Sequence, residues 1–158
     1  MFLQTSKDLA NTVGALRKDN FKIAVCNGTF DILHMDHIEL FKQASEKADR
    51  LIVLINSDAS VKENKGPKRP ILDETNRSRL VDAIKYVSYV YIFDGPTPIP
   101  TLDIIKPDIY VSGLDYGKDC IEKETVEKNG GIVIPKIGTK SISTTSIIER
   151  VLDAYGDK

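Results

Sequence analysis

Short apolar runs rich in β-branched residues alternate along the chain with longer amphipathic stretches. Uninterrupted apolar runs of this length are typical of parallel strands that are buried on both faces. We expect such strands at residues 23–26, 51–55, 87–93, 109–111 and 132–134.

The stretches between the runs have apolar residues at helical spacing, which predicts helices that each bury one face. Three stripes show this spacing: Ile38, Phe41, Ala44 and Ala48; Leu80, Ala83, Ile84 and Val87; and Ile147, Ile148, Val151 and Leu152. A further helix is expected at about residues 7–17. The alternation predicts an α/β fold, a Rossmann-like doubly wound five-stranded parallel sheet with right-handed connections.

No internal repeat or linker interrupts this alternation, so residues 1–158 are predicted to form a single domain. The polar stretch at residues 60–70 has no apolar period and is predicted to be a mobile loop.

Composition and charge narrow the class of protein. Apolar residues make up 41% of the chain and charged residues 28%, as in an ordinary globular protein, and the formal net charge is -1. This charge provides no basic field for nucleic-acid binding. The start of the chain lacks a signal-peptide pattern, and no apolar run is long enough to span a membrane. We therefore expect a cytoplasmic protein with no nucleic-acid and no membrane partner.

The first candidate site follows the first predicted strand. Ligands of open α/β sheets bind beyond the carboxyl ends of the strands, and here Gly28 opens a turn that leads into a predicted helix. The N–H groups and the dipole of a helix start favour a phosphate. His34 and His37, the two histidines of the chain, lie in one turn, so both could donate to one phosphate. The alternative is a pair of cap or surface residues.

These residues resemble the Gly-x-Phe-Asp-x-x-His-x-Gly-His signature of the cytidylyltransferase-like nucleotidyltransferases. The segment GTFDILHMDH matches the signature at Gly28, Phe30, Asp31, His34 and His37, with Thr29 at its variable second position. The chain departs from the signature at Asp36, where the family has glycine. A carboxylate that faces the phosphates would repel them. We therefore expect Asp36 to weaken the site, unless its side chain turns outward or binds magnesium.

A second candidate site precedes the last predicted helix. Ser143, Thr144 and Thr145 stand before an apolar helical stripe, so Ser143 or Thr144 is predicted to cap the helix. Capping alone would explain these hydroxyl residues, although a helix start also binds anions. The segment resembles Ile-Ser-Thr-Thr of the same family, which implies that the three residues hold the outer phosphates of a nucleoside triphosphate. An arginine of the family's glycerol-3-phosphate enzymes is replaced by Gly138, with Lys136 and Lys140 nearby.

Three further segments extend the resemblance. Residues 65–70, KGPKRP, resemble the Lys-Gly-x-x-Arg-Pro loop of heptose 1-phosphate adenylyltransferases, which implies that Lys65 approaches the phosphates. By the same resemblance Arg77 is a candidate phosphate contact, and Gly113, Asp115 and Tyr116 lie near the base and ribose. From the residues alone, a solvated surface loop is the favoured explanation of residues 65–70, while Arg77 could be a surface charge and Tyr116 a cover for the core edge.

The resemblance covers roughly residues 21–152 and is closest to the heptose 1-phosphate adenylyltransferase domain of ADP-heptose synthase. It implies a Mg²⁺-dependent transfer of AMP from ATP to a sugar 1-phosphate, with release of pyrophosphate. His34, His37 and Lys65 would be catalytic, and Asp31 would position Mg²⁺ or substrate. Two alternatives are a cytidylyltransferase that acts on glycerol 3-phosphate or a similar phosphate ester, and a non-catalytic nucleotide-binding protein. The family often forms dimers, so a homodimer is a candidate assembly.

Overall fold

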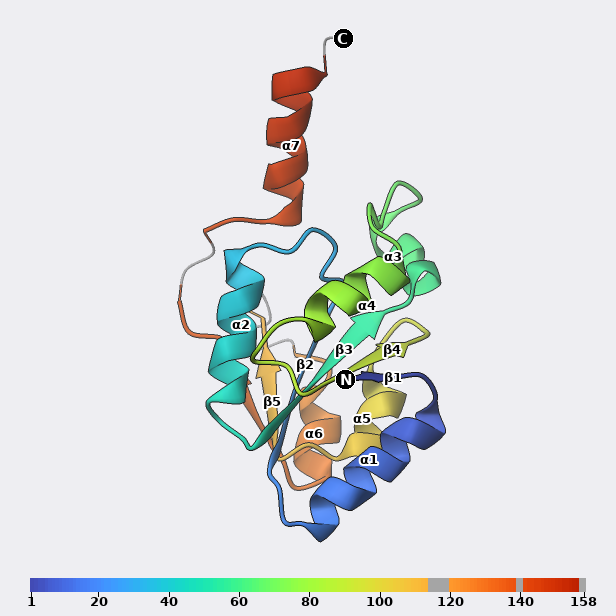
Figure 1. Cartoon of the computed structure of the whole chain (residues 1–158), viewed down its shortest axis with the longest axis vertical. Coiled ribbons are helices and arrows are strands. Elements are labelled where there is room, and N and C mark those ends of the chain that lie inside the picture. The colour runs from blue at the N-terminus through green and yellow to red at the C-terminus, as the bar shows by residue number, and fades with distance from the viewer. Residues whose placement is uncertain (114–119, 139–140, 157–158) are drawn as a thin grey trace.

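The computed structural model describes residues 1–113, 120–138 and 141–156. Over these residues the chain forms one parallel sheet of six strands between two layers of helices (Figure 1). The strand order is β1-β4-β3-β2-β5-β6, and every pairing is parallel. The strands are β1 (Phe2–Leu3), β2 (Ile23–Gly28), β3 (Arg50–Asn56), β4 (Tyr89–Phe93), β5 (Ile109–Ser112) and β6 (Ile132–Pro135). The predicted α/β doubly wound class is confirmed, with one strand more than expected.

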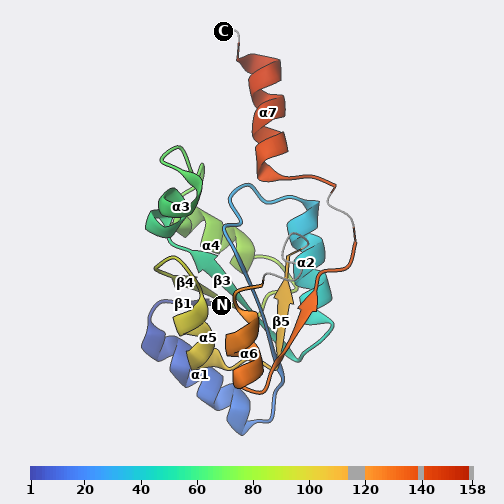
Figure 2. The same ribbon diagram turned by 180° about the vertical axis from the view of Figure 1, so that it is seen from behind.

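The described part of the chain contains seven helices, of which all but α7 pack around the sheet and cover both of its faces (Figures 1 and 2). They are α1 (Ser6–Lys18), α2 (Met35–Ser45), α3 (Asp58–Lys65), α4 (Glu74–Asp82), α5 (Ile99–Ile105), α6 (Lys123–Lys128) and α7 (Thr144–Tyr155). None of them is long and apolar enough to cross a lipid bilayer. The expected N-terminal helix is α1. It begins with a capping box formed by Thr5 and Asp8.

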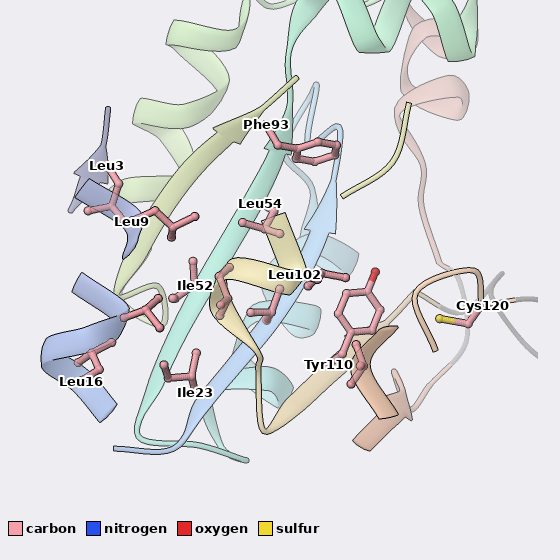
Figure 3. Packing of buried hydrophobic residues seen from close by; sticks show 14 residues of the cluster. Leu3, Leu9, Leu16, Ile23, Ile52, Leu54, Phe93, Leu102, Tyr110 and Cys120 are labelled. Carbon is pink, nitrogen blue, oxygen red and sulfur yellow. The ribbon is translucent and has the colours of Figure 1, made fainter. Parts of the chain in front are cut away.

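Alternate residues of each central strand enter opposite halves of the core. Ile23 of β2 and Ile52 of β3 join the cluster beneath α1 and α5 (Figure 3). Their neighbours Ala24 and Val53 join the cluster that packs against α2 and α4. A strand buried on both faces has no polar period, which is why continuous apolar runs identified these strands.

The strand order reverses direction at β2. From β2 the chain builds outward through β3 and β4, and it then places β5 on the opposite side of β2. The carboxyl ends of the strands surround a crevice at such a point, and ligands of doubly wound folds bind there.

Residues 60–65, predicted to belong to a loop, form most of α3. The helix starts because the Ser57 side chain accepts the N–H of Ser60 as an N-cap. α3 buries only Ser60 and Val61, so its sequence carries no apolar period that could reveal it. The prediction of a loop is therefore wrong for this part of the segment.

The bounds of α4 also differ from those predicted by its apolar stripe. α4 starts after Asp73, whose side chain accepts the N–H of Asn76, and it ends at Asp82. Residues 83–87, predicted to continue its apolar stripe, instead lead through turns into β4.

β1 is the strand that the sequence did not predict. It has only two residues, too few to show a period, and it is recognised only by its pairing with β4.

α7 extends away from the rest of the molecule in both views (Figures 1 and 2). Its apolar stripe predicted the helix correctly, but no residue of α7 is buried. Val151 and Leu152 of that stripe are 52% and 62% exposed. Packing against the sheet therefore does not hold α7 in place.

Candidate active site

A cleft of about 650 Å³ lies beyond the carboxyl ends of β2, β3 and β5. It combines three segments far apart in sequence: the turn after β2, the end of α3 and the start of α7. Of the predicted site residues, those that line the cleft are Gly28, Thr29, Phe30, Asp31, His34, His37, Lys65, Gly113, Ser143, Thr144 and Thr145. Arg77 is fully buried behind the cleft wall. Asp115 and Tyr116 fall outside the described residues.

The turn after β2 places an aromatic ring against the histidines. The ring of Phe30, only 3% exposed, packs edge-on against His37 at a centroid distance of 5.2 Å. A Cβ atom on Gly28 would lie 3.0 Å from the Phe30 ring, so a side chain at residue 28 would displace the ring. Gly28 and Phe30 therefore shape the site by fixing where His37 lies.

The two histidines lie side by side at the start of α2. Their rings stack with centroids 3.7 Å apart and planes inclined by 24°. Burial in the cleft wall, reinforced by the neighbouring His34, lowers the pKa of His37 to about 3. His37 Nδ1 is buried without a hydrogen-bond partner in the described part of the chain. A phosphate in the cleft would raise the pKa of His37, because a nearby anion favours the charged imidazole.

This lowered pKa predicts a pH dependence of stability. In the unfolded chain His37 takes up a proton below a pKa of about 6.5, whereas in the folded chain it does so only near pH 3. The free energy of unfolding therefore falls as the pH drops from about 6.5 toward 3. The loss is about 1.36 kcal/mol per pH unit, or about 2 kcal/mol at pH 5. Urea denaturation at pH 7 and pH 5 measures it. The wild type should lose about 2 kcal/mol more than His37→Gln; an equal loss in both proteins would contradict the prediction.

Asp31 does not have the role predicted for it. Its side chain is 1% exposed, and its oxygens accept the N–H groups of Ile71 and Leu72 at 2.9 Å and Arg69 Nε at 2.8 Å. Burial alone would raise the pKa of Asp31, but the hydrogen bonds from Leu72, Ile71 and Arg69 hold it below the ordinary value. Asp31 therefore fastens residues 69–72 to the turn after β2, and its oxygens are not available to a magnesium ion.

Arg77 is not a phosphate contact, because it has no exposed surface. Its guanidinium group donates four hydrogen bonds, to Leu72 O at 3.0 Å, Thr29 O at 2.6 Å, Asn56 O at 2.9 Å and Asp58 Oδ1 at 2.7 Å. These acceptors belong to the turn after β2, the end of β3, the start of α3 and the segment before α4. Arg77 thus joins the walls of the cleft from behind.

The start of α7 forms another wall of the cleft. Ser143 caps the helix as predicted: its Oγ accepts the N–H of Ser146 at 3.1 Å, and its own N–H donates to Ser146 Oγ at 3.0 Å. Thr144 and Thr145 are the first helical residues and line the cleft. The N–H groups of such a first turn, together with the helix dipole, attract an anion.

Asp36 binds the segment that leads into α7. Its carboxylate accepts hydrogen bonds from Ser141 and Ile142, and Lys136 Nζ lies 3.9 Å from its Oδ1. Burial alone would raise the pKa of Asp36, but the hydrogen bonds from Ser141 and Ile142 hold it below the ordinary value. Asp36 also lines the cleft, so its charge lies at the site but is compensated by these donors, and the expected weakening stays a prediction.

Several cleft residues were not among the predicted site residues. The polar ones among them are Asn27, Asp36, Asn56, Asn64, Arg69, Glu122 and Lys136. The ends of the strands could have revealed Asn27 and Asn56, because the carboxyl ends of neighbouring parallel strands meet at the crevice. Glu122 gave no such signal, since it precedes a short helix and matches no motif.

Comparison with known proteins identifies the class to which this chain belongs. The profile of the family described as cytidylyltransferase-like matches residues 25–150, a range that includes both phosphate-binding candidates. The chain belongs to the cytidylyltransferase-like family, and it is a nucleotidyltransferase.

Similar curated relatives are considerably longer than this chain. The bifunctional protein HldE of Geobacter metallireducens is 38% identical over 151 residues, which cover 95% of this chain and 31% of that protein. The protein of the same name from Koribacter versatilis is 42% identical over 147 residues, with 92% of this chain and 30% of that protein covered. This chain therefore spans less than a third of the length of these relatives.

Solved structures show the same fold. A lipopolysaccharide core biosynthesis protein from Thermoplasma volcanium matches with a TM-score of 0.67 and 26% identity, over 76% of this chain and 99% of that one. A pantoate-beta-alanine ligase from Francisella tularensis, solved in complex with beta-gamma ATP and beta-alanine, matches with a TM-score of 0.69 over 100% of this chain and 79% of that one. At 16% identity the latter match supports the fold alone.

Proposed function

We propose that this chain transfers AMP from ATP to a sugar 1-phosphate of the heptose 1-phosphate class, giving an ADP-sugar and pyrophosphate. The observation that carries the proposal is a single cleft lined by His34 and His37, by Lys65, and by Thr144 and Thr145 at a helix start. Similarity to HldE proteins and the resemblance of residues 65–70 to heptose 1-phosphate adenylyltransferases support the choice of substrates.

The reaction needs no strong general base. A phosphate oxygen of the sugar phosphate attacks the α-phosphorus of ATP and forms a new P–O bond. The bond from that phosphorus to the bridging oxygen breaks, and pyrophosphate leaves with its electron pair. Because the attacking oxygen is already an anion near neutral pH, catalysis consists of alignment for in-line attack and stabilisation of the developing charge.

Each group of cleft residues has its own role in this reaction. His34 and His37 donate hydrogen bonds to the α-phosphate, where charge develops in the transition state. Lys65, the last residue of α3, stabilises the charge on the bridging oxygen. Thr144 and Thr145 hold the outer phosphates through the N–H groups and hydroxyls of the first turn of α7.

Mg²⁺ would enter bound to ATP, as part of the substrate. Among the residues that the structure describes, no group of three or more His, Cys, Asp or Glu side chains is arranged to hold a metal ion. The Asp31 oxygens are already used within the chain. Mg²⁺ is often held mainly by substrate phosphates and water, so the cleft fits a magnesium–ATP complex without a metal site of its own.

A screen for pyrophosphate release tests the proposal. ATP, CTP, GTP and UTP are each combined with heptose 1-phosphate, other sugar 1-phosphates and glycerol 3-phosphate. We expect release only when an acceptor is present, with the highest kcat/KM for ATP and a sugar 1-phosphate. The double variant His34→Ala, His37→Ala, purified in parallel, reports contaminating activity.

Two other results would replace the proposal. A higher kcat/KM for CTP with glycerol 3-phosphate would make the protein a cytidylyltransferase. Nucleotide binding without turnover on any acceptor would make it a non-catalytic binding protein.

A further inference from the structure

Asp36 connects two walls of the cleft that are distant in sequence. Its Oδ2 accepts the backbone N–H groups of Ser141 at 3.0 Å and Ile142 at 3.3 Å, and its Oδ1 accepts the Ser141 hydroxyl at 2.8 Å. We call this set of three hydrogen bonds the Asp36 clasp. Hydrogen bonds to a carboxylate are stronger than those between neutral groups, because the acceptor carries charge.

The clasp lies directly before the phosphate-binding candidate of α7. Ile142 immediately precedes the N-cap Ser143, and Thr144 and Thr145 follow. Because no residue of α7 is buried, packing of this helix on the sheet does not position its first turn. The attachments before the helix must therefore position it.

α2 provides these attachments at both of its ends. Near the carboxyl end, the Gln43 side chain exchanges two hydrogen bonds of 2.8 Å with the backbone of Ile137. Near the amino end stands Asp36, in the same helical turn as His34 and His37. One rigid turn of α2 thus carries the histidines and also holds the segment that leads into Ser143.

We propose that Asp36 is a positioning residue that holds the start of α7 opposite His34 and His37, so that one triphosphate contacts both. This inference rests on the proposed function, since it assigns the outer phosphates to the start of α7. Asp36 itself lines the cleft, but its carboxylate is compensated by two N–H groups, a hydroxyl and the nearby Lys136.

The effect on binding follows from the population of the positioned segment. If only a fraction of molecules has the start of α7 in place, the apparent dissociation constant of ATP rises by the inverse of that fraction. AMP lacks the outer phosphates, so its dissociation constant should not depend on the clasp. A change in the ratio of ATP to AMP affinity therefore distinguishes positioning from a general loss of structure.

The test compares Asp36→Gly with Glu39→Gly. Both variants remove a carboxylate from α2 and place glycine in the same helix, but Glu39 does not line the cleft. Hydrogen–deuterium exchange of the nucleotide-free protein measures protection of the amides of Ser141 and Ile142. Calorimetry measures the dissociation constants of a non-hydrolysable ATP analogue and of AMP.

We expect faster exchange at Ser141 and Ile142 in Asp36→Gly, with a rise of about tenfold in the dissociation constant of the ATP analogue and less than about twofold for AMP. Glu39→Gly should match the wild type in all three measurements. Unchanged exchange in Asp36→Gly, or unchanged or tighter binding of the ATP analogue, would overturn the inference. If the wild-type protein bound no nucleotide, the proposed function would be overturned. The inference would then fall with it, regardless of the exchange measured at Ser141 and Ile142.

Discussion

Replacement of His37 by alanine is expected to lower kcat by about 100-fold or more and to change the dissociation constant of ATP by a much smaller factor. Contacts made mainly in the transition state affect kcat in this way, because the ground-state complex does not depend on them. His34→Ala should have an effect of the same kind, since the two rings stack at 3.7 Å in one turn of α2. Steady-state kinetics and calorimetric titration with ATP measure the two quantities.

Met35→Ala is the matched control, because Met35 lies in the same turn as His34 and His37 and its side chain is 65% exposed. Its kcat should stay close to that of the wild type. Denaturation curves must show that the histidine variants are folded, since Phe30 packs against His37. A folded histidine variant with nearly normal kcat would remove that histidine from the catalytic groups.

Replacement of Arg77 by methionine is expected to lower the free energy of unfolding by about 3–5 kcal/mol. Methionine fills most of the space, but it cannot donate to the carbonyl oxygens of Leu72, Thr29 and Asn56 or to Asp58. Groups buried without a donor each cost about 1–3 kcal/mol. Since a domain has a total stability of about 5–15 kcal/mol, this loss is a large share of it. Urea denaturation measures the change.

Arg79→Met is the control, because Arg79 belongs to the same helix and is exposed. Its free energy of unfolding should stay within about 0.5 kcal/mol of the wild-type value. A loss below about 1 kcal/mol in Arg77→Met would show that water satisfies the acceptors, and that Arg77 is not what joins the cleft walls.

The Asp36 clasp shows why family resemblance alone does not decide the effect of a substitution. In the sequence, Asp36 replaces a glycine beside two histidines, and a negative charge close to phosphates predicts repulsion. The direction of the side chain decides the sign of the effect. That direction is determined by donors at Ser141 and Ile142, more than 100 residues further along the chain.

The sequence by itself determined the elements whose signal is local. Continuous apolar runs identified the central strands, because burial on both faces removes any polar period. Hydroxyl residues before an apolar stripe restricted the cap to Ser143 or Thr144, and the structure shows Ser143, because an N-cap acts on amides within three residues. A glycine after the first apolar run and the spacing of His34 and His37 pointed to the segment that lines the cleft, because Gly28 ends β2 and the two histidines share one turn at the start of α2.

Only the tertiary structure decided what depends on partners distant in sequence. α3 is stabilised by its cap and by a single small buried patch, so it carried no periodic signal. Asp31 and Arg77 look like ligand-binding residues because a carboxylate and a guanidinium are the groups that ligands need. Their hydrogen bonds are taken by backbone groups that the fold brings to them from other segments. A charged side chain binds whichever partner the fold places within reach, and that distance is not encoded in any local pattern.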